Sequence, residues 1–151
     1  MDYQKILEEF NHYNSFGDFM GHQIEIIEAG HIKFSMEIKD HHLSSPNVAH
    51  GGAISSLMDA VLGVSVLSWA VTNKMICSTV EFKVNYLSPA HLGETLVGEG
   101  LIDFKGKSLA VSSGEIIEKK TGRRVAKGLG TFNLYPATKK DFLKEYFEKQ
   151  S

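Results

Sequence analysis

The 151-residue sequence contains a single cysteine, Cys77, and no charge excess of either sign. One cysteine cannot form an internal disulfide, and it leaves no set of thiolates for a zinc site. The 16 Lys and Arg residues nearly balance the 18 Asp and Glu residues, which gives a formal net charge of −2. A protein that binds the phosphate backbone of DNA needs a basic face, so this balance argues against nucleic acid as a partner.

No secretory signal is expected, because acidic residues stand among the first ten where a basic stretch and an apolar run would be needed. Residues 53–71 form an apolar run long enough to cross a bilayer. Asp59 near its centre, however, would cost about 2.5–3.5 kcal/mol on insertion. We therefore expect no membrane span and a cytoplasmic location. The mixture of 42% hydrophobic and 23% charged residues is typical of a globular protein.

Hydrophobic spacing predicts one α+β domain over residues 1–151, with a short amphipathic helix at each end. The two terminal helices are expected around Tyr3, Ile6, Leu7 and Phe10, and around Phe142, Leu143, Tyr146 and Phe147. Alternation of apolar and polar residues predicts strands near 23–26, 32–38, 80–86, 94–104, 108–118 and 124–135, with turns at 105–107 and 121–122. Residues 40–49 have no period and are expected to form a loop.

A central helix is predicted from about residue 52 to residue 69. This segment is apolar or small nearly all the way round and contains no Lys, Arg or Glu. A helix with that pattern is typically enclosed by protein on every side. The prediction is therefore an antiparallel sheet of about six strands that curls around one buried helix.

Asp59 does not fit this environment, because it is the only charged residue between His50 and Lys74. Asp is almost never fully buried unless it is paired, and no Lys or Arg stands at the i±3 or i±4 positions. The carboxylate is therefore expected to reach a polar cavity or a wet interface, where it is a candidate general base or nucleophile. The alternative is a structural Asp that accepts hydrogen bonds from backbone or serine groups.

Gly51 and Gly52, which follow His50 at the start of the helix, form the second candidate. Helix N-termini present unpaired N–H groups, and glycines let a ligand oxygen approach them closely, as in an oxyanion hole. The alternative is a glycine pair that only makes the turn. Gly51 and Asp59 are separated by about 12 Å along one helix, whereas a reacting carbonyl needs both groups within about 3 Å. If both act, two chains must place their central helices antiparallel, which predicts an obligate symmetric dimer.

Several motifs occur in a characteristic order between residues 44 and 135. They are His50-Gly51-Gly52-Ala53, Asp59 nine residues after the His, Asn85-Tyr86-Leu87-Ser88-Pro89-Ala90, Gly106-Lys107-Ser108-Leu109-Ala110 and Val125-Ala126-Lys127-Gly128. This ordered set resembles the hot-dog-fold thioesterases of the phenylacetate-degradation (PaaI-like) type. The resemblance implies a long helix wrapped by a curved antiparallel sheet, homodimers that often pair into tetramers, and hydrolysis of acyl-CoA thioesters with no cofactor.

The resemblance also implies roles for individual residues. Asp59 corresponds to the carboxylate that activates water or attacks the thioester, the Gly51 N–H to the donor for the carbonyl oxygen, and His50 to the residue that shapes the turn. Family members commonly carry an Asn six residues before the His, but Ser44 stands at that position. Either Asn47 takes this role through a different loop path, or the role is missing.

Thr79 corresponds to the family's water-positioning hydroxyl, yet it shares its parity with Glu81 and Lys83 on the polar face of the predicted strand. A β-bulge, or an edge that faces an interface, would be needed to aim Thr79 at Asp59. The alternative is that Thr79 is an ordinary surface residue of the strand.

CoA contacts are expected at Gly52 and at three cations in predicted turns, Lys105, Lys107 and Arg123, although such cations are more often simply solvated. No metal site is expected, because adjacent His41 and His42 should diverge and no second cluster completes the ligands. Two other functions stay open: an acyl-CoA-binding or sensing dimer without chemistry, and a hot-dog dehydratase, which needs a His and a carboxylate in one site.

Overall fold

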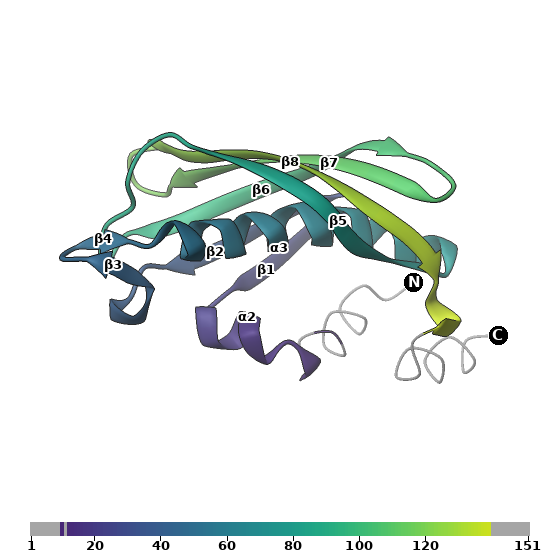
Figure 1. The fold of residues 1–151 in the computed structure, drawn as a ribbon, viewed down its shortest axis with the longest axis horizontal. Coiled ribbons are helices and arrows are strands. Elements are labelled where there is room, and N and C mark those ends of the chain that lie inside the picture. Colours follow the sequence, from purple (N-terminus) through teal and green to yellow (C-terminus); the bar gives the residue numbers. More distant parts are fainter. Residues whose placement is uncertain (1–9, 11, 140–151) are drawn as a thin grey trace.

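The computed structural model describes residue 10 and residues 12–139. These residues form a six-stranded antiparallel sheet, in the order β1-β2-β6-β7-β8-β5, that curves over the long helix α3 (Gly51–Ala70) (Figure 1). The strands are β1 (Gln23–Glu28), β2 (His31–Glu37), β5 (Met75–Tyr86), β6 (Thr95–Lys105), β7 (Leu109–Glu118) and β8 (Arg124–Pro136). The predicted α+β hot-dog architecture is confirmed. Both predicted terminal helices lie outside the described residues, except for Phe10.

One face of α3 packs against the concave side of the sheet and forms the core. The side chains of this face are fully buried: Leu57, Met58, Val61, Leu62 and Val66. Gly100 on β6 permits the close approach, because a Cβ there would lie 2.5 Å from the backbone oxygen of Val61. Burial contributes about 1.5–3 kcal/mol for each large side chain, so this face fixes the rotation of the helix. The stretch Gly51–Asn73 is long and apolar enough to cross a membrane, but it is the mostly buried core helix of this fold.

The opposite face of α3 is not covered by the sheet, so the prediction of a helix enclosed on every side is wrong for a single chain. The side chains along this face are only half-buried: Ser55, Ser56, Asp59, Ala60, Gly63 and Val64. Apart from Asp59 and Val64 they are very small, and small residues occur both in tight cores and at close contacts between chains. Composition therefore could not separate an enclosed face from one that awaits a partner.

Two segments before α3 also differ from the prediction. Residues 40–49 are not an irregular loop: a 3₁₀ turn (Asp40–His42) leads into a hairpin of β3 (Leu43–Ser45) and β4 (Val48–Ala49). The helix α2 (Ser15–Met20) was not predicted, because its six residues are too few to show a period. Asn14 caps it by accepting a hydrogen bond from the Gly17 N–H at 3.0 Å, and Gly21 ends it with a φ of 75°.

The edge strand β5 contains a bulge at Val80. Thr79 pairs with Phe132 and Glu81 pairs with Thr131, so Val80 has no partner of its own on β8. Val80 is 58% exposed, although the alternation over residues 80–86 groups it with the apolar Phe82 and Val84. The extra residue changes which face each side chain takes, because side chains alternate along a strand. Thr79 therefore turns toward α3, and the bulge is the feature that the sequence analysis required for Thr79 to reach Asp59.

Candidate functional site

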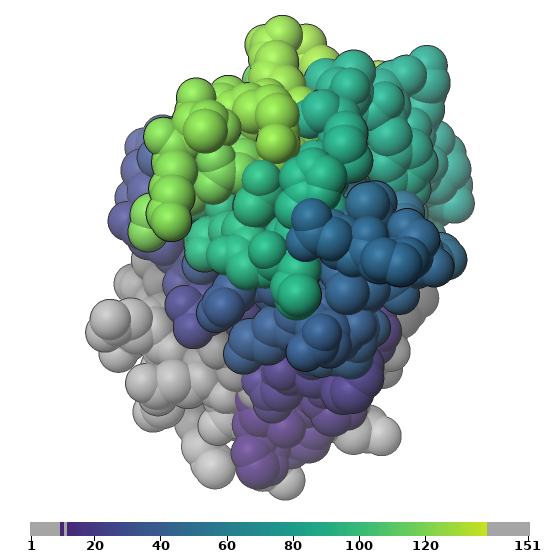
Figure 2. Space-filling view, turned by 90° about the vertical axis from the view of Figure 1, so that its left-hand side faces the viewer, coloured from purple at the N-terminus to yellow at the C-terminus, as the bar shows by residue number. Residues whose placement is uncertain are grey.

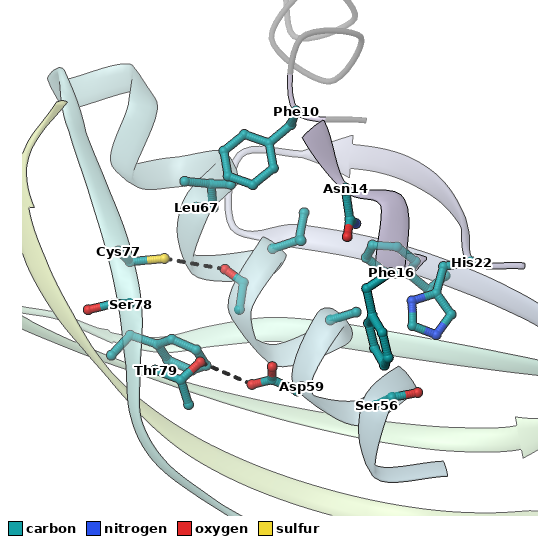
Figure 3. Close-up of a pocket in the computed structure, with 15 residues that line it drawn as sticks. Phe10, Asn14, Phe16, His22, Ser56, Asp59, Leu67, Cys77, Ser78 and Thr79 are labelled. Carbon is teal, nitrogen blue, oxygen red and sulfur yellow. Dashed lines mark hydrogen bonds between the residues drawn. The ribbon is translucent and has the colours of Figure 1, made fainter. Parts of the chain in front are cut away.

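Asp59 stands at the wall of a cavity of about 250 Å³ between α3, β5 and the segment around α2 (Figure 3). The Thr79 hydroxyl donates a hydrogen bond to Asp59 Oδ1 at 3.0 Å, which is drawn as a dashed line in Figure 3. Most of the lining is apolar. Four phenylalanine rings and three aliphatic side chains contribute to it: Phe10, Phe16, Phe34, Phe132, Ala60, Val64 and Leu67. The arrangement places a carboxylate beside a space that suits an apolar group.

The neighbouring serines do not use the Asp59 carboxylate as their acceptor. The Ser55 hydroxyl donates to the Gly52 carbonyl at 3.1 Å, and the Ser56 hydroxyl donates to the Ala53 carbonyl at 2.7 Å. Within the described part of the chain, Thr79 is the one side chain that donates to Asp59. This pattern disfavours a purely structural Asp and leaves Oδ2 available to accept a hydrogen bond from water.

Cys77 lines the same cavity but is not a nucleophile. Burial raises the pKa of the Cys77 thiol to about 12, and the nearby Asp59 carboxylate contributes to the rise. The thiol therefore stays protonated at neutral pH, and its Sγ lies 3.6 Å from the Gly63 carbonyl oxygen, to which it donates. Because the thiolate is the reactive form of cysteine, the protonated Cys77 thiol is a poor nucleophile at neutral pH.

His22 is a cavity residue that sequence reasoning missed. It lies before the start of β1, and burial, followed by the nearby His42, lowers the pKa of His22 to about 4. The imidazole is therefore neutral at neutral pH. No local sequence pattern distinguishes a single His in the connection between α2 and β1. His22 lines the cavity of Asp59 only because α2 and β2 fold around it.

The first turn of α3 carries the second candidate feature. His50 Nδ1 accepts a hydrogen bond from the Gly52 N–H at 2.7 Å, and the His50 carbonyl accepts one from the Ala53 N–H at 2.9 Å. In the part of the chain that the structure describes, the Gly51 N–H is left without a partner. It adjoins a cavity of about 380 Å³ lined by Ala49, Gly51, Ile54, Tyr86, Leu87, Ser88, Pro89 and Ala90. A helix N-terminus with a free N–H is suited to hold a developing oxyanion.

Gly52 is required by this cap. A Cβ on Gly52 would lie 2.8 Å from His50 Nδ1, so a side chain there would displace the imidazole. We expect Gly52 to support the turn that presents Gly51, and nothing in the geometry distinguishes it as a contact to CoA.

The hairpin of β3 and β4 packs beside this turn, at the end of the molecule that Figure 2 shows with residues 40–50 in blue next to residues 86–94 in teal. The Ala49 N–H donates to the Ala90 carbonyl at 2.9 Å, and Val48 bridges to His91. Asn47 stands at the exposed tip with a φ of 65°, and its backbone oxygen lies 3.1 Å from His91 Nδ1. Neither Asn47 nor Ser44 lines the two cavities described above.

The two cavities share no lining residue, so one chain does not bring Gly51 and Asp59 together. Both residues belong to the same straight run of α3 and are eight positions apart. The helical rise separates them by about 12 Å along the axis. A single site that uses both groups therefore needs a second chain.

The predicted phosphate-binding cations do not converge either. Lys105 lies at the end of β6 with its Nζ 5.7 Å from the centre of the Trp69 ring, and Lys107 is exposed in the following turn. Arg123 is at the other end of the sheet, where its guanidinium binds Glu94 at 2.7 Å. Arg123 is thus already paired, whereas the lysines are open to solvent.

His41 and His42 do not diverge as predicted, because their ring centroids lie 4.1 Å apart. Burial is the main cause that lowers the pKa of His42. Among the described residues, no group of three or more His, Cys, Asp or Glu side chains is arranged to hold a metal ion.

Comparisons with known proteins bear on the family and the fold. A family model described as the thioesterase superfamily matches residues 46–125. Acyl-coenzyme A thioesterase 13 of Homo sapiens is 29% identical over 106 residues, which cover 70% of this chain and 74% of that protein. The Mus musculus protein of the same name is 30% identical over 100 residues, which cover 66% of this chain and 69% of that protein.

Solved structures with the same architecture include the E. coli PaaI protein from the phenylacetic acid degradation operon. It has a TM-score of 0.74 at 19% identity and covers 84% of this chain and 88% of its own, which supports the fold. A hypothetical thioesterase from Streptococcus pneumoniae TIGR4, solved with coenzyme A, has a TM-score of 0.69 at 25% identity. It covers 76% of this chain and 89% of its own.

Proposed function

This chain belongs to the thioesterase superfamily, and from that premise we propose that it hydrolyses acyl-CoA thioesters to a free acid and CoA at sites formed by two copies of the chain. The observation that carries the proposal is the Asp59 carboxylate beside a largely apolar cavity, held by Thr79 through one oxygen only. Relatives that are named acyl-coenzyme A thioesterases, and a thioesterase structure that contains coenzyme A, support the class of substrate.

The proposed reaction begins with the acyl group in the apolar cavity and its thioester carbonyl near Asp59. As general base, Asp59 takes a proton from a water molecule while the water oxygen attacks the carbonyl carbon. As nucleophile, Asp59 would instead attack that carbon itself, loss of the CoA thiolate would leave an anhydride between the acyl group and Asp59, and water would then hydrolyse this anhydride. Thr79 orients the carboxylate in either route. The tetrahedral intermediate then collapses, the C–S bond breaks, and the CoA sulfur leaves and takes up a proton.

The negative charge that develops on the carbonyl oxygen needs a donor, and we propose the partner's Gly51 N–H. Within one chain the Gly51 N–H is too far from Asp59. The uncovered face of α3, which carries Asp59, offers a surface for a second copy of the same helix in the antiparallel direction. A two-fold axis between the helices places each Gly51 near the other chain's Asp59 and generates two equal sites. Pairing of such dimers into tetramers, and a cytoplasmic location, stay predictions.

Binding of the CoA phosphates is proposed for Lys105 and Lys107, because these side chains are exposed near one end of α3. Arg123 is a weaker candidate, since its guanidinium would have to leave Glu94. In this proposal the CoA is bound at a site that two chains form together, and its phosphates extend from that site to the two lysines.

The test measures thiol release from a panel of acyl-CoA thioesters by the wild type and by Asp59→Asn. We expect the substitution to lower kcat by at least about 100-fold, because an amide cannot accept the proton from water. Asp103→Asn is the matched control, since Asp103 is an exposed carboxylate on β6 that accepts a hydrogen bond from Ser113. Unchanged turnover in Asp59→Asn would refute the catalytic assignment.

Two other results would favour other functions. Tight binding of acyl-CoA by the wild type without thiol release would indicate a sensing dimer. The presence of His22 in the cavity of Asp59 is the pairing that a dehydratase needs, and hydration of an enoyl-CoA without thiol release would indicate that activity.

A further inference from the structure

Tyr86, the last residue of β5, contacts the first residue of α3. Its hydroxyl donates a hydrogen bond to the Gly51 carbonyl at 3.1 Å, and its ring lies 3.5 Å from the place that a Cβ on Gly51 would take. The side chain is 56% exposed and lines the cavity beside Gly51. We propose that Tyr86 is a positioning residue for the thioesterase reaction, which holds the Gly51 N–H in the direction of the substrate oxyanion. This inference rests on the proposed function.

Gly51 needs such support because of its place in the chain. The first turn of a helix lacks part of its hydrogen bonding, and a glycine has more backbone freedom than any other residue. Gly51 and Gly52 stand there together. An oxyanion donor nevertheless has to be held within about 0.5 Å of its productive position. The two peptide groups that flank Gly51 must therefore be fixed by contacts from elsewhere.

The structure supplies hydrogen bonds to both of these peptide groups. The peptide before Gly51 is held through the His50 carbonyl, which accepts a hydrogen bond from the Ala53 N–H within the helix. The peptide after Gly51 is held at both ends, because the Gly52 N–H donates to His50 Nδ1 and the Gly51 carbonyl accepts from the Tyr86 hydroxyl. The position of Tyr86 is in turn set by its pairing with Ala126 on β8, whose side chain is fully buried. Among these hydrogen bonds, the one from Tyr86 is the contact that comes from the sheet, and it limits the rotation of Gly51 from the carbonyl side.

The exposure of Tyr86 argues against a role in the core. A tyrosine with 56% of its surface exposed contributes little apolar burial to folding. Its ring covers the glycine instead, and its hydroxyl bonds to a backbone oxygen of the turn that presents the candidate oxyanion donor. Tyr86→Phe keeps the ring and removes only that hydrogen bond.

The experiment compares kcat and KM for wild type and Tyr86→Phe with one acyl-CoA substrate. We expect kcat to fall about tenfold with KM unchanged, because the oxyanion donor acts in the transition state. Tyr135→Phe is the control, since Tyr135 lies on β8 and lines neither the cavity of Asp59 nor the cavity of Gly51. An unchanged kcat in Tyr86→Phe, with or without a rise in KM, would overturn the proposal.

A second variant tests whether Tyr86 acts through Gly51. Gly51→Pro removes the N–H at the first helical position, where proline is favoured, and His50 already has the extended ψ of 139° that a residue before proline adopts. If Tyr86 positions that N–H, adding Tyr86→Phe to Gly51→Pro should lower kcat by less than twofold more. Losses that multiply would overturn the inference.

These measurements separate the inference from the proposed function on which it rests. If the wild type releases thiol, and Asp59→Asn and Gly51→Pro are slow while Tyr86→Phe behaves like the wild type, only the role of Tyr86 fails. If the wild type releases no thiol from acyl-CoA, the proposed function and the role of Tyr86 fail together.

Discussion

Mixing two inactive variants distinguishes a site shared by two chains from a site within one chain. Asp59→Asn removes the carboxylate, and Gly51→Pro removes the N–H while it leaves the first turn of α3 able to form. Loss of an oxyanion donor typically lowers kcat about 100- to 1,000-fold, and we expect each variant alone to be slower than the wild type by at least that lower factor.

The mixed dimer is expected to regain one of its two sites. In the antiparallel arrangement, the Gly51→Pro chain contributes an intact Asp59 to a site where the Asp59→Asn chain contributes an intact Gly51. The other site carries both defects. Random association of equal amounts makes half of the dimers mixed, and each of these has half of its sites intact. The mixture should therefore reach about a quarter of the wild-type activity.

The assay is thiol release after the two variants are unfolded together and refolded, with light scattering to confirm that dimers form. A chain that carries both substitutions is the control. Mixed with an equal amount of wild type, it should reduce activity to about a quarter, because mixed dimers then have no intact site, whereas independent sites would leave about half. An activity equal to the sum of the two parent variants, or a stable and active monomer, would refute the two-chain site.

Two further predictions concern β5 and the turn after β7. Deleting the unpaired bulge residue Val80 should leave Thr79 facing α3 and keep the rate of thiol release within about tenfold of wild type. Deleting Lys83, which is paired with Leu129 on β8, should abolish folding because it inverts the faces of the strand. An equal loss of activity and of folded protein in the two deletions would refute this interpretation. Hydrogen bonds from the Lys120 N–H and from the following threonine lower the pKa of Glu118 from 4.5 to about 2. The free energy of unfolding of the wild type, measured in urea, should therefore decrease as the pH falls from 4.5 toward 2, and that of Glu118→Gln should decrease less. An equal decrease in the two proteins would contradict this role of Glu118.

Most of the sheet could be predicted from the sequence because one face of each strand is buried or half-buried, so that apolar and polar residues alternate. The last predicted strand, residues 124–135, became β8 (Arg124–Pro136), and the predicted turns at 105–107 and 121–122 join the expected strands. The parity of β5 could not be predicted, because one unpaired residue at Val80 inverts it and no composition marks a bulge. From the sequence, one can say only that Thr79 reaches Asp59 if the strand contains a bulge or has an edge that faces an interface.

The candidate site was predicted in part, for a similar reason. Asp59 was found because a lone charge in an apolar helix has to be explained, and that argument needs no tertiary information. His22 and Tyr86 were not found as site residues, because each reaches its cavity through sheet curvature and through contacts between distant segments. The uncovered face of α3 was misjudged since small residues suit both a tight core and a close interface.

The strand β5 contacts both candidate catalytic groups of its own chain, Asp59 through Thr79 and Gly51 through Tyr86. In the two-chain arrangement these two groups belong to different sites. In the proposed dimer each β5 would therefore contact both active centres. A ligand that shifted this strand at one centre would also shift its contact at the other, which is the kind of physical connection that cooperativity between sites requires.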